Sequence, residues 1–253
     1  MLPRRRPLAL AISTLLSAGA VVIAAAAGDT RPTQAAQSVP SSPARLVQMQ
    51  YHFVQVTLIH EAIIRGDLPS VREPALTLAQ LPIPPDTPAR IAPFAAAIGQ
   101  AAGRAAEAAD LAAAASATTL MLGQCGECHR AAGVLPAPSR TIRPDVGGIV
   151  GHMLEHQRAV DSLLQGLIIP SATEWRQGAE RLKAAPLRPD QYPPDPRLTS
   201  ELKRTDARVH QIADRAAKAS DAPTRAAVYS DLLTTCAQCH GLHRQIWGPD
   251  QKR

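Results

Sequence analysis

Apolar side chains recur every three or four residues near residue 50 of the chain. They are Leu46, Met49, Phe53, Val56, Ile63 and Ile64, with His60 on the same face. This spacing is typical of a helix that buries one face, and a glycine after the last apolar position is a common helix end. The pattern therefore predicts an amphipathic first helix that ends at Gly66.

Prolines and an aspartate mark the predicted boundaries of the helices that follow. A shorter second helix fits residues 70–81, because the run Pro82–Pro88 would break it, and Asp86 is placed to cap the next helix. An alanine-rich third helix is predicted from about Ala89, and a fourth helix carries residues 125–130. The sequence from 105 to 117 has no clear breaker, so the end of the third helix is left open.

The second part of the chain repeats the first. His52 precedes Gly66 by 14 residues, and His152 precedes Gly166 by the same interval. Residues 62–68 align with residues 162–168 at an offset of 100, and the offset grows to 111 farther along the chain. Most of the eleven additional residues fall in the proline-rich stretch 185–196. A duplication with one lengthened loop explains this pattern.

The duplication predicts four helices in the second copy. They cover residues 149–166, 171–185, 195–220 and 224–247, with Asp195 as a helix cap and Pro196 in the first turn. Eight helices without a strand pattern predict an all-α protein. Its helical regions are expected at residues 44–133 and 147–253, joined by a short linker at residues 134–146.

The N-terminus carries the features of an export signal. Arg4, Arg5 and Arg6 precede an apolar run that reaches Ala27, which predicts a secretory signal over residues 1–27. The run is also long enough to be an uncleaved membrane anchor. Residues 28–43 are predicted to be a disordered leader. Without the signal, the net charge falls from +6 to +3, and the chain has no basic stripe interleaved with aromatics that would indicate nucleic-acid binding.

All four cysteines belong to two C-x-x-C-H motifs. These are Cys125-Gly-Glu-Cys128-His129 and Cys236-Ala-Gln-Cys239-His240. This spacing is the attachment sequence for haem c, in which both thiols bond to the porphyrin and the histidine binds the iron. The sequence therefore predicts two covalently attached haem c groups, with His129 and His240 as proximal ligands.

Two other interpretations of the cysteines are weaker. A structural zinc site would leave the histidine after each pair as a coincidence that occurs twice, and the pairs are 111 residues apart. A thioredoxin-like redox pair is expected in a βαβ setting, which the sequence around the motifs does not predict. Covalent haem is attached on the outer face of the bacterial membrane, so the haem interpretation agrees with an exported, periplasmic protein.

The position of the motif within each repeat points to a family. His240 lies 13 residues from the C-terminus and no methionine follows it. In this the chain resembles the cytochrome c′ family (class II cytochromes c), and the resemblance covers both copies. It implies two tandem four-helix bundles with one haem each. Arg130 and Arg244, just beyond the motifs, would suit haem propionates, although helix C-termini favour cations in any case.

In such a bundle the end of the fourth helix lies beside the beginning of the first. His52 and His152 are at equivalent positions early in their first helices, which makes them the predicted distal ligands of the two irons. Met49 is the rival of His52, and His156 is the rival of His152. Members of the cytochrome c′ family typically leave this position open, so a histidine here departs from the family pattern.

Two histidine ligands on each iron would leave no coordination site for a substrate. The chain is therefore predicted to be a dihaem electron-transfer protein rather than an enzyme, with periplasmic redox proteins as partners. Ligation by two imidazoles favours a lower potential than ligation by histidine and methionine. The alternative is a gas-binding or gas-sensing protein with an open distal site on one or both haems. A dihaem peroxidase is a third hypothesis, which the late position of the motifs disfavours.

Overall fold

The computed structural model describes residues 42–137, 146–184, 186–192 and 194–247. In these ranges the chain is all-helical, with eight α-helices and one short 3-10 helix. The signal over residues 1–27 and most of the leader lie outside the described residues, although Ser42 and Pro43 already begin the first helix. None of the helices in the described part is both long and apolar enough to span a membrane.

The first half contains the four helices that the sequence predicts. They are α1 (Pro43–Ile64), α2 (Pro69–Gln80), α3 (Ala92–Ala106) and α4 (Leu111–Ala132). Helix α1 stops where expected, because Gly66 adopts a φ of 69° that favours glycine.

Two aspartates of the first half have roles that the sequence did not reveal. Asp86 was predicted to cap α3, but this is wrong, because α3 begins only at Ala92 and Asp86 pairs with Arg45 at 3.1 Å. Asp110 caps α4 instead, and its carboxylate accepts a hydrogen bond from the Ala113 N–H at 2.7 Å. This cap also supplies the boundary that the sequence left open after α3.

The second half repeats this order of helices. It contains α5 (Gly148–Ile168), α6 (Ala172–Lys183), the 3-10 helix η1 (Pro189–Gln191), α7 (Pro196–Lys218) and α8 (Ala222–Trp247). Asp195 caps α7 as predicted, by accepting hydrogen bonds from the first N–H groups of the helix. Gly166, however, lies inside α5 and does not end it. A side chain at Gly166 would collide with the backbone of Trp175, so this glycine permits close packing of α5 on α6.

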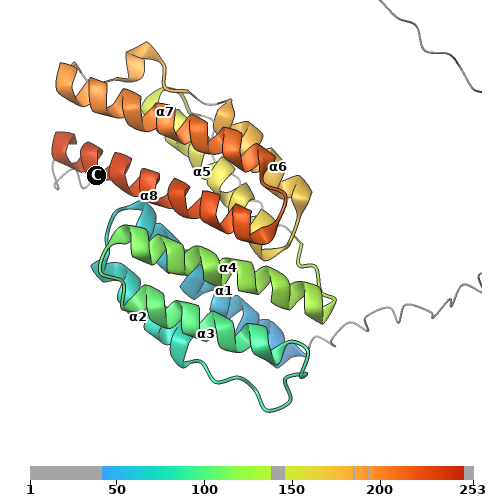
Figure 1. The fold of residues 1–253 in the computed structure, drawn as a ribbon. Helices are drawn as coiled ribbons and strands as arrows, with labels where there is room; N and C mark the ends of the chain where they lie inside the picture. The colour runs from blue at the N-terminus through green and yellow to red at the C-terminus, as the bar shows by residue number, and fades with distance from the viewer. Residues whose placement is uncertain (1–41, 138–145, 185, 193, 248–253) are drawn as a thin grey trace, which may run out of the picture. The chain divides into compact units, whose positions relative to one another are not determined.

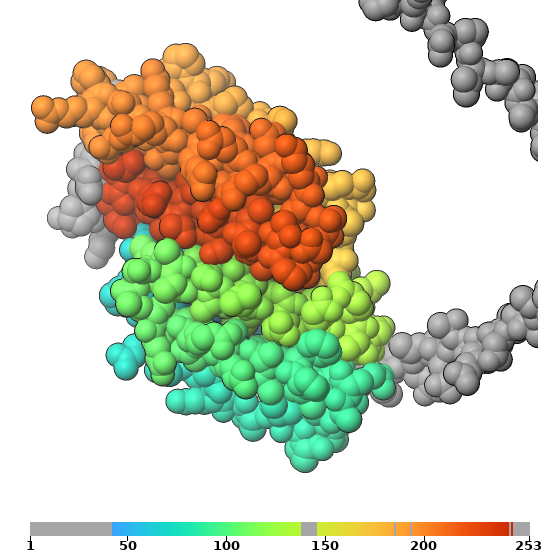
Figure 2. Space-filling view, viewed as in Figure 1, coloured from blue at the N-terminus to red at the C-terminus, as the bar shows by residue number. Residues whose placement is uncertain are grey.

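Helices α4 and α8, which carry the two cysteine motifs, pack against each other in the middle of the molecule. They run antiparallel, because the last turns of α4 around Arg130 and the first turn of α8 around Arg225 line the same small cavity. Figure 2 shows the side chains of the two helices meeting along the visible face. Most of the buried apolar side chains of both halves belong to one continuous core, and Ile91 and Ala132 form a small separate cluster.

The first helix of each half also reaches the motif helix of the other half. A methyl group at Gly66, after α1, would lie 3.3 Å from the Ala237 carbonyl oxygen of α8, and a methyl group at Gly126 of α4 would collide with the Leu167 carbonyl of α5. Gly126 and Ala237 are equivalent residues of the two motifs. The two halves therefore make similar cross-contacts around the α4–α8 pair.

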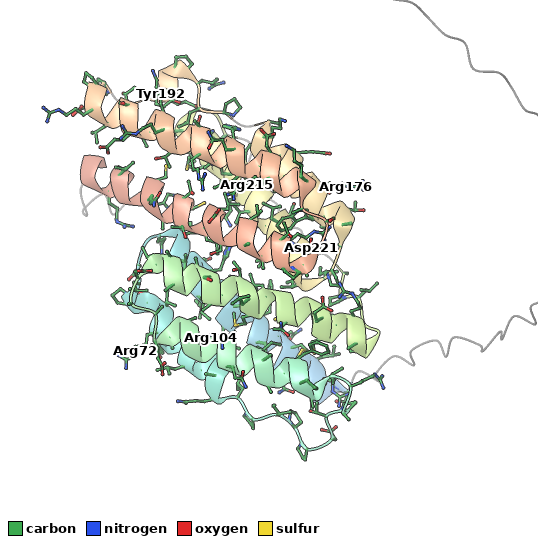
Figure 3. The ribbon with its side chains drawn as sticks, in the orientation of Figure 1. Arg72, Arg104, Arg176, Tyr192, Arg215 and Asp221 are labelled. Carbon is green, nitrogen blue, oxygen red and sulfur yellow. The ribbon has the colours of Figure 1, made fainter. Side chains whose placement is uncertain are left out.

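Side-chain hydrogen bonds reinforce the packing around α8. In the core, His60 Nε2 of α1 lies 2.7 Å from the Tyr229 hydroxyl, which donates to the Val160 carbonyl of α5 at 3.1 Å. At the surface, Asp221, labelled in Figure 3, caps the start of α8 by accepting from the Thr224 N–H at 2.8 Å. The position of α8 is thus fixed by contacts with both halves of the chain.

Candidate functional site

The second half contains a cavity of about 480 Å³ that opens beside the end of α8. Side chains from α5, α7 and α8 form most of its wall, together with the end of α1 and the loop before η1. The lining residues are Ile64, Ile149, Val150, His152, Met153, Leu154, His156, Gln157, Val160, Leu187, Thr205, Asp206, Val209, Cys236, Cys239 and His240. The wall is mainly apolar with a few polar groups, as is common in cofactor sites.

Three of the lining residues are the reactive groups of the second motif. Cys236, Cys239 and His240 occupy consecutive turns of α8 and face the cavity. Burial raises the pKa of Cys236 to about 12, with the neighbouring Cys239 adding to the effect. Burial, together with the charge of Asp206, raises the pKa of Cys239 to about 11. Both thiols are therefore protonated at neutral pH, which argues against a thioredoxin-like pair, in which one thiol has a lowered pKa.

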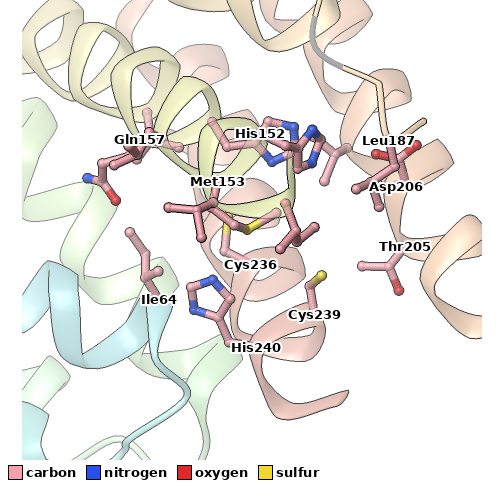
Figure 4. Close-up of a pocket in the computed structure, with 16 residues that line it drawn as sticks. Ile64, His152, Met153, Gln157, Leu187, Thr205, Asp206, Cys236, Cys239 and His240 are labelled. Atoms are coloured by element: carbon pink, nitrogen blue, oxygen red, sulfur yellow. The ribbon is translucent and has the colours of Figure 1, made fainter. Parts of the chain in front are cut away.

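His152 reaches the same cavity from the beginning of α5. It is 7% exposed, and Figure 4 shows its ring on the opposite side of the cavity from the ring of His240. The residues 152 and 240 are far apart in sequence, so the fold brings the predicted distal histidine together with the predicted proximal one. The rival His156 also lines the cavity, one helical turn after His152, and the centroids of their rings are 4.1 Å apart.

Asp206 of α7 is a member of this site that the sequence analysis missed. A ring nitrogen of His152, a ring nitrogen of His156 and a carboxylate oxygen of Asp206 all lie within 4.8 Å of one another. A signal was present in the sequence, because Asp206 follows the buried Leu202 by four residues and precedes the buried Val209 by three. A carboxylate on the buried face of a helix is unusual and indicates a local function or partner.

The residues of this cavity fit a haem, with thiols and an imidazole on one helix and a second imidazole across the space. The two histidines and the carboxylate are also a donor set that suits a single zinc ion. Both possibilities are compatible with the chemistry of the side chains, but only haem uses the two cysteines and His240.

The first motif lies in different surroundings at the end of α4. The Nδ1 of His129 lies 2.6 Å from the Ile168 carbonyl oxygen at the end of α5. A carbonyl oxygen can only accept, so Nδ1 must carry the proton and the lone pair of the ring is on Nε2. A hydrogen bond of this kind orients a histidine whose other nitrogen binds a metal. Burial raises the pKa of Cys125 to about 12, with the charge of Cys128 adding to it.

His52 of α1 has a buried polar atom without a partner. Its Nε2 makes no hydrogen bond within the described part of the chain, and burial lowers the pKa of the ring. The segment between α2 and α3 joins the start of α1 to the end of α4, through the Arg45–Asp86 pair and a 3.0 Å hydrogen bond from Arg90 to the Ala131 carbonyl. The start of α1 and the end of α4 therefore both contact this segment, and an iron ligand would satisfy the orphaned nitrogen of His52.

The first half nevertheless differs from the second in how its cavity is formed. A second cavity, of about 220 Å³, lies between the end of α4, the end of α5 and the start of α8. Gly126, Glu127 and Arg130 line it, but His52, His129 and the two thiols of the first motif do not. The structure thus collects the predicted ligands of the second half around one cavity, while the cavity beside the end of α4 is lined by other residues of the first motif helix.

The two arginines predicted to face propionates have other neighbours. Arg130 forms an ion pair with Glu127 one turn earlier on α4. The guanidinium group of Arg244 lies over Gly66 at the end of α1. The pKa of Asp67 is lowered mainly by hydrogen bonds from Ser70, and the charge of Arg244 contributes. The role of these arginines beside a haem stays a prediction.

No protein-family model, curated protein or solved structure matches this chain.

Proposed function

We propose that the chain is an exported dihaem c-type cytochrome that carries electrons between periplasmic redox proteins. In this proposal each half is a four-helix bundle like those of the cytochrome c′ family and holds one haem c. The observation that carries the proposal is the second-half cavity, where Cys236, Cys239 and His240 of α8 meet His152 of α5. The distal histidine was predicted from the recurrence of the residue in both repeats and from the bundle geometry, and this cavity is where the two predicted ligands of one iron meet.

Different residues of the chain would attach the porphyrin and bind the iron. The thiols of each motif would add across the vinyl groups of one porphyrin, which forms two thioether bonds without a leaving group. His129 and His240 would be the proximal ligands, and His52 and His152 the distal ligands. A bound haem supplies a one-electron couple between ferric and ferrous iron. The protein would orient the ligand nitrogens, as the Ile168 carbonyl oxygen can do for His129.

Electron transfer follows from ligation by two histidines, because no coordination position would remain for a substrate. The antiparallel packing of α4 and α8 also supports it. Arg225 of α8 lies at the level of Arg130, and Cys236 follows eleven residues later. Cys125 lies five residues before Arg130 on the antiparallel α4, so at 1.5 Å per residue the nearest ends of the two motifs would be separated by roughly 9 Å along the helix axis. Such closeness suits passage of electrons between two haems in one chain.

Spectroscopy of the protein purified from a host that attaches haem c tests this proposal. We expect low-spin spectra in both oxidation states, no binding of CO, and oxidation and reduction of both haems by small redox mediators. A high-spin charge-transfer band together with rapid CO binding would contradict electron transfer by closed haems. That outcome would favour the gas-binding alternative, in which His52 and His152 only line the distal pockets.

A further inference from the structure

The second-half cavity contains a carboxylate next to the predicted distal ligand. The side chain of Asp206 is 11% exposed, and one of its oxygens lies within 4.8 Å of a nitrogen of His152 and a nitrogen of His156. Its Oδ1 is buried and lies 3.7 Å from Nε2 of His210, one turn farther along α7. Burial raises the pKa of Asp206, and the charge of His210 and a hydrogen bond from the Leu187 backbone oppose the rise.

The first half has no counterpart of this carboxylate. The repeat offset in this region is between 109 and 111, so the residues equivalent to Asp206 are among Ala95, Ala96 and Ala97. The residue equivalent to His156 is Val56, at the offset of 100 that holds for the first helices. Whichever offset applies, alanine stands in α3 where α7 presents a carboxylate. The two predicted haem pockets are therefore electrostatically different.

A negative charge in a partly buried pocket acts strongly on a nearby iron, because little water screens it. It stabilises the ferric form, which carries one more positive charge, over the ferrous form. A carboxylate beside a metal-bound imidazole also raises the basicity of that ligand, which acts in the same direction.

We propose that Asp206 is a positioning residue that lowers the potential of the haem in the second half below that of the haem in the first half. Electrons would then pass from the second haem to the first. This inference rests on the proposed function, since it needs both haems to be bound. It assigns a role to Asp206 whether His152 or its rival His156 is the distal ligand, because the carboxylate is close to both rings.

A spectroelectrochemical titration of the haem-loaded protein at pH 7 tests the proposal. In Asp206→Asn we expect one of the two midpoint potentials to rise while the other is unchanged, and EPR of the ferric protein to show altered g-values for one haem only. Asp206→Glu keeps the charge and should retain the wild-type potentials. The matched control is Asp214→Asn on the same helix, which removes an exposed carboxylate paired with Lys183 and should move neither potential.

Two results would overturn the inference. One is an Asp206→Asn protein whose two midpoints equal those of the wild type, and the other is an equal shift of both midpoints. If Asp206→Asn does not fold, Asp206→Ser gives the same test with a smaller neutral side chain. Failure of the proposed function is distinguishable, because it would appear in the wild-type protein as missing haem or as binding of CO. Failure of this inference would appear only in the comparison of variants.

Discussion

The two halves of the molecule carry the same cysteine motif, and in the second half Cys236, Cys239 and His240 line a cavity of about 480 Å³ together with His152. The third helices of the two halves differ in length and composition. Helix α7 has 23 residues, and Thr205, Asp206 and Val209 from its middle form one wall of the cavity. Its counterpart α3 has only 15 residues and presents mostly alanine.

The first helices differ in a complementary way. The N-terminal part of α1 leaves several large apolar side chains uncovered, among them Leu46 at 53%, Met49 at 38% and Phe53 at 41% exposed. In α5 the only large apolar side chain of this kind is Val150. Exposed apolar surface of this extent usually marks a place that something covers. We expect the haem of the first half to cover part of it, which would make the two halves more alike than they are without haem.

The largest expected effect comes from removing one pair of thiols. The variant Cys125→Ser with Cys128→Ser and the variant Cys236→Ser with Cys239→Ser should each lower the covalent haem content from two per chain to one. The second variant should also lose more thermal stability, because it leaves a cavity of about 480 Å³ empty. A pyridine haemochrome assay and thermal unfolding measure the two effects. Equal stability of the two variants would mean that the difference between the halves disappears when haem binds.

The second-largest expected effect comes from replacing the predicted distal histidines, which should change CO binding differently at the two haems. We expect His52→Ala combined with Met49→Leu, which also removes the rival ligand, to open one haem to CO, since Val56 stands one turn later in the first half and cannot bind iron. His152→Ala should stay largely low-spin, because the ring of His156 is adjacent and can replace it. Only the double variant of His152 and His156 should bind CO fully at the second haem. CO difference spectra of the ferrous proteins decide this, and unchanged spectra in the variant that lacks both His52 and Met49 would exclude both residues as ligands.

Lowering the pH should destabilise the protein through His60, whose position in the second half is not a histidine. Burial lowers the pKa of His60 from 6.5 to about 4, and the equivalent residue in the second half is Val160. The unfolded state therefore binds more protons between these values, so stability should fall as the pH drops from 6.5 to about 4. The fall attributable to His60 is about 3 kcal/mol at most.

Urea unfolding across this pH range measures the loss. His60→Gln keeps a hydrogen-bonding group near the Tyr229 hydroxyl but does not titrate, so its unfolding free energy should depend less on pH. An identical pH dependence in wild type and variant would show that the acid sensitivity arises elsewhere.

The smallest expected effect concerns the cross-contact between α4 and α5. Gly126→Ala should destabilise the protein by about 1–3 kcal/mol, because the new methyl group would collide with the Leu167 carbonyl. The equivalent position in the second half is already Ala237, so the two contacts are not equally tight. Gly123→Ala is the matched control, since a methyl group there meets nothing within 4 Å. Chemical unfolding of both variants gives the comparison, and equal stabilities would refute the close approach.

Much of the helical architecture could be predicted because its signals are local. Gly66 ends α1 and Asp195 begins α7 through interactions with residues a few positions away. The failures have a different origin. Asp86 has the chemistry of a cap but binds Arg45, and Gly166 resembles a helix end but serves the packing of α5 on Trp175. In both cases a contact distant in sequence decides the role, and neither propensity nor spacing contains it.

The residues of the candidate site also fall into two groups, those that the sequence identifies and those that only the fold brings into the site. The thiols and His240 follow from the motif, and His152 follows from the repeat, so these four could be found from the sequence. Asp206 could not be placed in the site, because its closeness to His152 depends on how α7 packs beside α5. The repeats differ at these positions in the sequence, with alanine opposite Asp206 and Val56 opposite His156, but only the fold shows that Asp206 and His156 lie in the same cavity.

The central claim is that each half binds one porphyrin covalently through its own motif. The intact mass of the protein purified from a host that attaches haem c tests this claim most directly. The account predicts a mass equal to that of the processed chain plus two haem groups, retained under denaturing conditions. A mass equal to that of the processed chain alone, from a colourless sample, would contradict it.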